Sequence, residues 1–183
     1  MKKLLILFFA LGIFGSAQAQ LFGVRAGLSS ANFSDTNYNA KVGAHVGIYY
    51  WYEIDNFAIE PGVQFSQKGY ESNEKTTGAV IDERLNYLDF PLIFRLDIIP
   101  VLNVFAGPQA SFLLSRKYEL AGVTSTSTDV IRGYDFGGLV GMCAYLPGGV
   151  NLQLSYDFGL TGLNYYDTDV KNQVLKISAG FDF

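Results

Sequence analysis

Few residues in this chain carry the chemistry of catalysis or metal binding. The chain has one histidine, His45, and one cysteine, Cys143. A serine hydrolase needs its histidine beside a nucleophilic serine, and the chain contains no G-x-S-x-G motif. One histidine without a second soft ligand does not predict a zinc site, and a lone cysteine forms neither a disulfide nor a cysteine cluster within one chain. We therefore expect no catalytic residue, no metal and no cofactor.

The acidic and basic residues offer a different chemistry, because many of them share one face of segments with alternating polarity. That face carries His45, Lys68, Asp135 and Asp182 together with the residues named below. Charges of both signs in a confined interior should pair, because an unpaired buried charge is costly. A proton or ligand path is the alternative. We predict a structural network of salt bridges made of Arg25, Glu60, Arg95, Asp89, Asp157 and Lys176. Within this network, Arg25, Glu60 and Arg95 should lie together near one end of the interior.

The segments that hold these residues alternate with the period of a β-strand. In residues 150–159, Val150, Leu152 and Leu154 alternate with Asn151 and Gln153. Two uncharged stretches, 98–115 and 136–156, are long enough for a transmembrane helix. However, the first alternates in the same way, and Pro147-Gly148-Gly149 interrupts the second. Eight strands of about 9 to 14 residues are predicted, at 20–28, 40–52, 57–68, 84–96, 102–115, 133–146, 150–159 and 175–183.

The connections between these strands alternate in length. Tight turns at 53–56, 97–101 and 147–149 alternate with longer polar segments at 29–39, 71–83, 117–132 and 163–172. Short turns on one rim and long loops on the other, with an even number of strands, are typical of an outer-membrane barrel. The predicted fold class is therefore all-β, an eight-stranded antiparallel up-and-down transmembrane β-barrel with short periplasmic turns and longer extracellular loops.

Glycines indicate which face of the barrel points inward. About ten of them share the polar face with the charges. Small residues suit the cramped interior of a narrow barrel. We therefore expect the polar face to line the lumen and the apolar face to contact outer-membrane lipid, with aromatic residues at both interfaces.

Three prolines fall inside predicted strands, namely Pro61, Pro91 and Pro108. Each removes one donor from the hydrogen-bond ladder, and a closed barrel has no free edge where this would be harmless. We expect β-bulges at these positions.

The first nineteen residues predict export. Lys2 and Lys3 precede an apolar run over 4–14, and Ala17-Gln18-Ala19 provides a cleavage site. As a helix that run would cross only about half of a hydrocarbon core of about 30 Å, which disfavours a retained anchor. We predict a signal peptide over 1–19 and one outer-membrane barrel domain over 20–183.

Without Lys2 and Lys3, 11 basic and 17 acidic residues leave a net charge of −6, which offers no basic patch for nucleic acid.

Several segments resemble a known family. Residues Asn86-Tyr87-Leu88-Asp89-Phe90-Pro91-Leu92 resemble the "Y-L-acidic-x-P-L" strand of the PorT-like family of small outer-membrane β-barrel proteins, often labelled porin family. The opening Phe22-Gly23-Val24-Arg25-Ala26-Gly27-Leu28 and the closing strand resemble this family as well. The resemblance implies a barrel protein without family-wide catalytic residues, and one branch is implicated in protein secretion and gliding machinery. The terminal aromatic Phe183 resembles the recognition signal of the β-barrel assembly machinery, which implies that machinery as a partner during insertion.

Three functions fit these features. The first is a non-enzymatic anchor whose four loops contact an extracellular or envelope partner, in envelope integrity, adhesion or a secretion machine. The second is a small-solute porin, and the third is a lipid-modifying hydrolase. Eight strands favour the first over the second, because side chains fill the interior of such barrels and aqueous channels need about sixteen strands. The inward position expected for His45 disfavours the third.

Overall fold

The computed structural model describes residues 21–34, 39–73, 80–120, 122–165 and 169–183. The predicted signal peptide lies outside these residues. The strands are β1 (Leu21–Phe33), β2 (Asn39–Ile54), β3 (Phe57–Asn73), β4 (Val80–Ile99), β5 (Leu102–Leu120), β6 (Val123–Ser125), β7 (Tyr134–Leu146), β8 (Val150–Gly159) and β9 (Asn172–Asp182).

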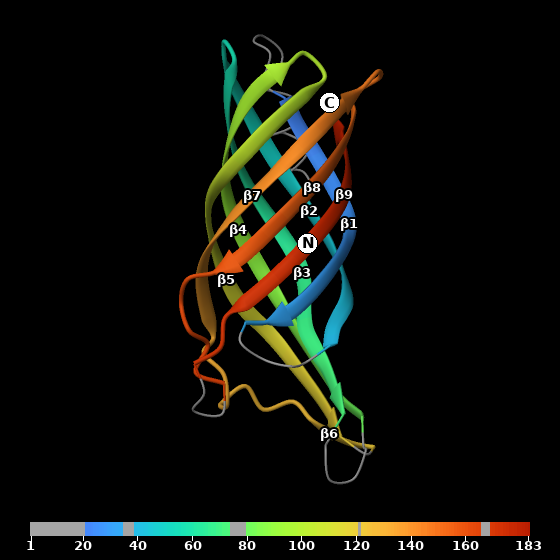
Figure 1. Ribbon diagram of the computed structural model, residues 1–183, viewed down its shortest axis with the longest axis vertical. Helices are drawn as coiled ribbons and strands as arrows, with labels where there is room; N and C mark the ends of the chain where they lie inside the picture. The colour runs from blue at the N-terminus through green and yellow to red at the C-terminus, as the bar shows by residue number, and fades with distance from the viewer. Residues whose placement is uncertain (1–20, 35–38, 74–79, 121, 166–168) are drawn as a thin grey trace, which may run out of the picture.

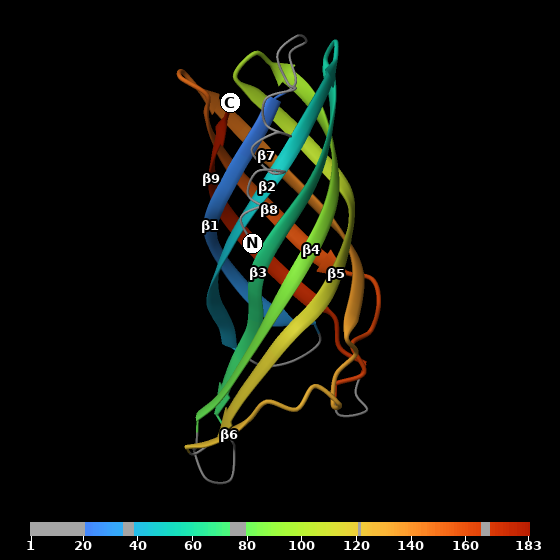
Figure 2. The same cartoon turned by 180° about the vertical axis from the view of Figure 1, so that it is seen from behind.

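Eight of these strands form a closed antiparallel barrel, which confirms the predicted fold class. Each strand pairs with its neighbours along the chain, β4 pairs with β5, β5 pairs with β7, and β9 returns to pair with β1 (Figures 1 and 2). The short strand β6 pairs only with the end of β5. Gly148 and Gly149 adopt φ of 86° and 79° in the tight β7–β8 turn, a conformation that glycine adopts readily. No helix in the described residues is long and apolar enough to cross a membrane.

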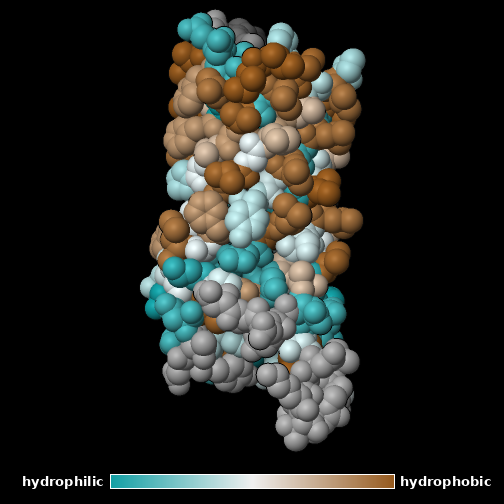
Figure 3. Space-filling model, viewed as in Figure 1, coloured by the Kyte–Doolittle hydropathy of each residue, from teal (hydrophilic) through white to brown (hydrophobic). Residues whose placement is uncertain are grey.

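Burial alternates along the strands with the predicted period. In β9 every second side chain is buried, from Asn172 to Gly180, and the residues between them are mostly exposed. Large apolar side chains such as Leu28, Ile48 and Ile177 are more than half exposed on the outer surface. Exposed large apolar side chains lie on all eight barrel strands and make an apolar belt around the barrel. On the face drawn in Figure 3, polar residues gather towards the loop end. The polar face therefore lines the lumen.

Glycines on β1 let side chains from its two neighbours meet inside the barrel. Gly27 pairs with His45 on β2 and with Ser178 on β9, and a Cβ at this position would lie 2.8 Å from the His45 ring. Gly23 likewise lies between Tyr49 and Asp182, and a Cβ there would lie 2.4 Å from the Tyr49 hydroxyl. Each of these two glycines therefore does more than reduce crowding in the lumen. It leaves room for a residue of β2 and a residue of β9 to contact each other across β1.

Four strands are longer than the expected 9 to 14 residues: β2 contains 16 residues, and three others are longer still. β3, β4 and β5 contain 17, 20 and 19 residues. They continue into the predicted loops 71–83 and 117–132 and project beyond the rest of the barrel at the loop end (Figure 1). The sequence obscured these extensions because a sheet that leaves the membrane has polar residues on both faces, so the alternation between apolar and polar disappears.

The prediction of β-bulges at the three prolines is wrong. Register shifts occur elsewhere, between Ala40 and His45 in β2, between Asn86 and Tyr87 in β4, and between Asp97 and Ile99 at the end of β4. Instead, pairing is interrupted for two positions beside each proline and resumes in the same register. The gaps fall between Tyr49 and Tyr52 on β2, between Pro61 and Gln64 on β3, and between Pro91 and Phe94 on β4. A missing donor therefore costs local hydrogen bonds without requiring an extra residue.

Candidate functional site: the lumen and its loop end

Glu60 lies between two arginines near the short-turn end of the lumen. Arg25 donates to both carboxylate oxygens of Glu60, at 2.9 and 3.4 Å. Arg95 Nε donates to Glu60 Oε2 at 2.6 Å, and its two terminal nitrogens donate to Asn103 at 3.1 Å and Gln153 at 3.0 Å. All three charged side chains are buried. The structure thus brings together the three residues that the sequence grouped at this end.

A second group of charges occupies the middle of the lumen. Asp89 lies 3.2 Å from Lys68 and 3.6 Å from Lys176, and Ser66 donates to it at 2.6 Å. Lys176 also lies 2.6 Å from Asp157. Asp89, Asp157 and Lys176, which were predicted as part of one network with Arg25, therefore form a separate cluster with Lys68.

Buried charges nearly balance within the described residues. Six lysine or arginine side chains are buried, against five carboxylates. The remaining cation, Lys41, sits at the loop end, where it contacts the partly exposed carboxylates of Glu71 and Asp82. Of the other inward residues named from the sequence, Asp135 accepts a hydrogen bond from Asn172 at 2.8 Å. The lumen therefore gathers charged side chains of both signs along its length.

His45 has a serine partner that the sequence did not reveal. Its Nε2 lies 2.8 Å from Ser178 Oγ, and both residues are buried inside the barrel. His45 Nδ1 has no hydrogen-bond partner in the described part of the chain, so no carboxylate orients the ring as a catalytic acid would. The pair also faces away from the lipid. Within the described residues, no three histidine, cysteine or carboxylate side chains gather as a metal site would require.

The short-turn rim is held by polar and aromatic contacts. Asp182 accepts hydrogen bonds from Tyr49 at 2.5 Å and from Asn151 at 3.0 Å, and the rings of Trp51 and Tyr145 lie 5.2 Å apart. Phe183, the predicted assembly signal, is 68% exposed just beyond β9. Its backbone N–H donates to the carbonyl of Phe22 at 2.8 Å.

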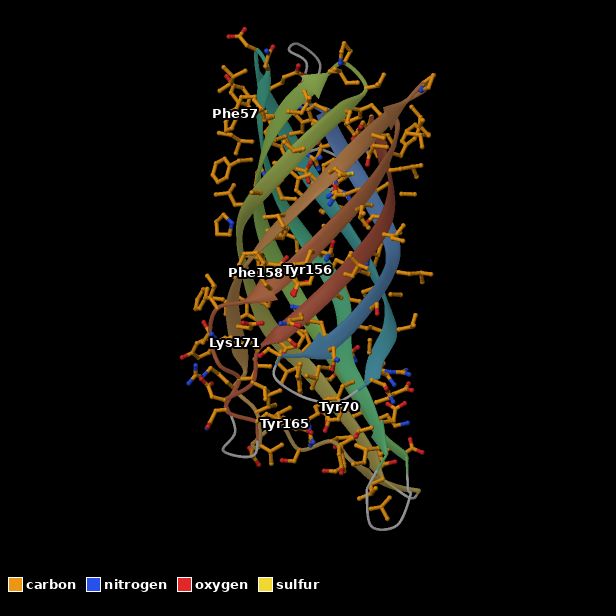
Figure 4. All side chains as sticks on the ribbon, in the orientation of Figure 1. Phe57, Tyr70, Tyr156, Phe158, Tyr165 and Lys171 are labelled. Carbon is orange, nitrogen blue, oxygen red and sulfur yellow. The ribbon has the colours of Figure 1, made fainter. Side chains whose placement is uncertain are left out.

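A hydrophobic cluster, here called the cap, fills the loop end of the lumen. It consists of side chains from the barrel wall and from the segments after β6 and β8, namely Phe33, Tyr70, Leu85, Tyr87, Ile131, Leu163, Tyr165 and Val170. Figure 4 shows Tyr70 on the projecting sheet and Tyr165 on the loop opposite it. Leu85, Tyr87 and Leu163 are completely buried. Because these segments have no regular period, the sequence did not reveal the cap.

Hydrogen bonds tie the cap to the projecting sheet. Arg116 donates to both carboxylate oxygens of Glu83, at 2.7 and 2.9 Å, and to the carbonyl of Ser127 at 2.9 Å. Tyr165 donates to Glu83 at 2.8 Å and lies 2.9 Å from the hydroxyl of Tyr70. Burial and the nearby Glu83 carboxylate raise the pKa of Tyr165 above its usual range, so its hydroxyl stays a donor. The segments after β6 and β8 are therefore fastened over the lumen.

The cavities found inside the barrel among the described residues are about the size of a water molecule. Three of them measure about 10, 10 and 20 Å³, and polar side chains line each one, among them Asp135, Arg25 and Gln153. Each has room for about one water. A larger hollow of about 450 Å³ lies outside the lumen, on the lipid-facing wall between β1 and β9. Side chains therefore fill the lumen, and it contains no pocket for a small-molecule substrate among the cavities described here.

Comparisons with known proteins agree with this architecture. The chain matches the family model "Outer membrane protein beta-barrel domain" over residues 16–165. Neisserial surface protein A (NspA) superposes with a TM-score of 0.58 at 17% identity, over 91% of this chain and 98% of that one. Ail, the attachment invasion locus protein of Yersinia pestis, superposes with a TM-score of 0.54 at 14% identity, over 91% of this chain and 100% of that one.

At these identities the two structures show the fold that the chain shares with them. No curated protein sequence matches the chain. The family match covers most of its length, and with the closed barrel and apolar belt it indicates where the protein resides. The chain belongs to the outer membrane protein β-barrel domain family, and it is located in the outer membrane.

Proposed function

We propose that this protein is a non-enzymatic anchor of the outer membrane that presents its loops and the projecting β3–β4–β5 sheet to a partner outside the cell. The filled lumen is the observation that carries this proposal. Charged side chains pair along the barrel and the cap covers the loop end. Such a barrel contributes a stable support, and the surfaces left for function are those at its loop end.

A porin is the weaker alternative, although the family resemblance includes that label. An eight-stranded barrel is just wide enough for its own side chains. A solute would have to displace the Glu60 pairs as well as the cap, and separating buried ion pairs is costly. Tyr87 and Phe105 add bulk to the same interior, where both are buried.

Conductance in planar bilayers tests whether the barrel is closed. The purified protein should show no large, steady conductance, and the variant Leu163→Ala/Tyr165→Ala, which truncates the cap, should open more often. Stable nanosiemens channels from the unmodified protein would contradict the anchor proposal and support a porin.

A lipid hydrolase is the third possibility, and His45 with Ser178 is the pair it would need. Both side chains are buried, without access from the lipid. Phospholipid and lipid A incubated with the protein should remain intact. Hydrolysis that is present in the unmodified protein and lost in Ser178→Ala would overturn the non-enzymatic proposal.

The partner can be sought from the loop end. The names of NspA and Ail describe a surface protein and an attachment and invasion protein, and the PorT-like resemblance suggests a secretion or gliding machine. A photo-crosslinking residue at Val123, which is 71% exposed on β6, should give a protein adduct on intact cells. The same residue at Gly148, in a short turn, serves as the control for the periplasmic side. Adducts from Gly148 alone would contradict a partner outside the cell.

Two further proposals concern biogenesis. Residues 1–19 act as a signal peptide that is removed after export, and the exposed Phe183 is recognised by the β-barrel assembly machinery. The position of Phe183 directly after β9 and the exposure of its ring support the second proposal.

A further inference from the structure

Outward-facing charges differ between the two ends of the barrel. In the described parts of the chain, every lysine or arginine that is not buried lies at the loop end, namely Arg84, Lys117, Arg132 and Lys171. The short-turn end carries the partly or fully exposed acidic residues Glu53, Asp55 and Asp97. Within the described ranges, the barrel therefore presents exposed cations only at the side where the longer loops meet the outer leaflet.

Two of these cations are direct neighbours. Arg84 on β4 and Lys117 on β5 are paired residues in the ladder, and both are exposed. Like charges directly opposite each other destabilise a sheet. Lys117 also lies 3.0 Å from Glu119, but both of those side chains are about half exposed, and exposed pairs of this kind contribute little. An anion between Arg84 and Lys117 would turn the repulsion into attraction.

The pair lies at the height of lipid headgroups. The row below it contains Asn86 and Ser115, which are joined by an exposed hydrogen bond of 2.9 Å. Below that row the outward residues are apolar, with Phe90, Phe112 and Leu114 exposed. Arg84 lies four residues from Leu88 in the direction of the loop end. This spacing is about 13 Å along the strand, which gives about 10 Å along the membrane normal for a strand tilted by about 40°. Long basic side chains bend back towards the membrane surface, so both reach the headgroup layer.

The neighbouring strand leaves room for a headgroup. Arg84 pairs on its other side with Gly69 of β3, which has no side chain to cover the guanidinium group. A guanidinium group binds two phosphate oxygens at once, and an ammonium group adds a compact charge beside it. We propose that Arg84 and Lys117 together bind the phosphate group of a phosphorylated glycolipid in the outer leaflet.

The test uses the full mature protein, refolded in detergent with EDTA so that divalent cations form no bridges. Thermal unfolding is recorded with bisphosphorylated lipid A, with dephosphorylated lipid A and with inorganic phosphate, and native mass spectrometry counts the retained lipid. The variant is Arg84→Gln/Lys117→Gln. The control, Arg132→Gln/Lys171→Gln, removes two cations from the same end of the barrel and changes the net charge equally.

Bisphosphorylated lipid A should raise the unfolding temperature of the unmodified protein and of the control by about 3 °C or more. The Arg84→Gln/Lys117→Gln variant should lose this shift and the retained lipid. Without lipid, this variant should unfold at about the same temperature as the unmodified protein, because the loss of the repulsion is offset by the loss of the Lys117–Glu119 pair, which leaves Asp82 opposite Glu119. If it does not fold, Arg84→Gln and Lys117→Gln are measured singly, and each should reduce the shift.

Three results would overturn the proposal. An equal shift with dephosphorylated lipid A would mean that only acyl chains bind. An equal shift with inorganic phosphate would mean an anion site without preference for lipid. A shift that persists in Arg84→Gln/Lys117→Gln and its single variants, or one that is lost equally in the control, would mean that this pair is not the site.

Discussion

At the short-turn end of the lumen, the carboxylate of Glu60 lies between two buried guanidinium groups. Both arginines therefore depend on Glu60 for charge compensation. Arg25 and Arg95 both contact it, and each arginine also stacks near a ring, Arg25 at 4.2 Å from the centre of Tyr49 and Arg95 at 4.9 Å from that of Phe105. Without the carboxylate, two buried cations would face each other with only neutral groups between them.

We expect Glu60→Gln to reduce the free energy of unfolding by about 3 kcal/mol, because breaking a buried ion pair leaves an uncompensated charge. Urea titration of the protein folded in lipid vesicles measures this difference. Glu53→Gln, which removes an exposed carboxylate at the same end, should change stability by about 0.5 kcal/mol or less. Equal losses in the two variants would show that the lumen pairs contribute no more than surface charges.

Strand parity identified inward residues but not their partners. Arg25, Glu60 and Arg95 could be grouped from the sequence because each lies near a short turn. The contact of Arg95 with Gln153 joins residues 58 positions apart, and it depends on which strands face each other across the lumen. The same holds for His45 and Ser178, whose meeting over Gly27 requires β9 to pair with β1 in one register. A single sequence does not contain that register.

At the scale of the strands, alternation was sufficient to predict the barrel where the chain crosses the membrane. β8 shows why, since from Val150 to Phe158 its apolar residues face lipid and its polar residues face the lumen. β9 follows the same rule from Leu175 to Phe181, but at its loop end Gln173 is exposed and Val174 is buried. Outside the membrane the same rule fails. In the extensions of β4 and β5, partly exposed residues such as Ile81 and Asp82 lie on both faces of the sheet, beside the buried Glu83. The cap residues Ile131 and Leu163 lie in segments with no period.

The orientation of β8 can be tested with one substitution at two depths. Leu154 is exposed within the apolar belt and pairs with Ile177. Leu154→Arg should destabilise the protein folded in vesicles by about 2 to 4 kcal/mol, because it places a charge in hydrocarbon. Leu160→Arg, just past the end of β8, should cost only about 0 to 1 kcal/mol. A larger loss at Leu160 would mean that the belt has been placed at the wrong depth.

At the scale of the whole barrel, the wall is not uniform around its circumference. The three interruptions beside the prolines fall on consecutive pairs, β2–β3, β3–β4 and β4–β5, so they form one diagonal line. The pairing between β8 and β9 continues from Val150 to Phe158 without a gap. Pro91 also lines two of the water-sized cavities, so this line borders the places inside the barrel with room for water.

Amide deuterium exchange should therefore be faster at 50, 51, 60, 62, 63, 90, 92, 93 and 107, which lack a paired residue on one side, than at 150–158 and 173–181, which are paired on both sides. Mass spectrometry of the protein in nanodiscs, with fragmentation that resolves single residues, measures the difference. Uniform protection around the barrel would contradict this expectation.

The mechanical consequence is an uneven stiffness. A sheet bends most easily where hydrogen bonds between its strands are missing. A force on the projecting β3–β4–β5 sheet would therefore first deform the barrel along the line of interrupted pairing beside Pro61, Pro91 and Pro108. The half of the barrel made of β7, β8, β9 and β1 would keep its shape and hold the protein in place. A pull on the loop end would then tilt the projecting sheet before it strained the strand pair β1–β9 that closes the ring.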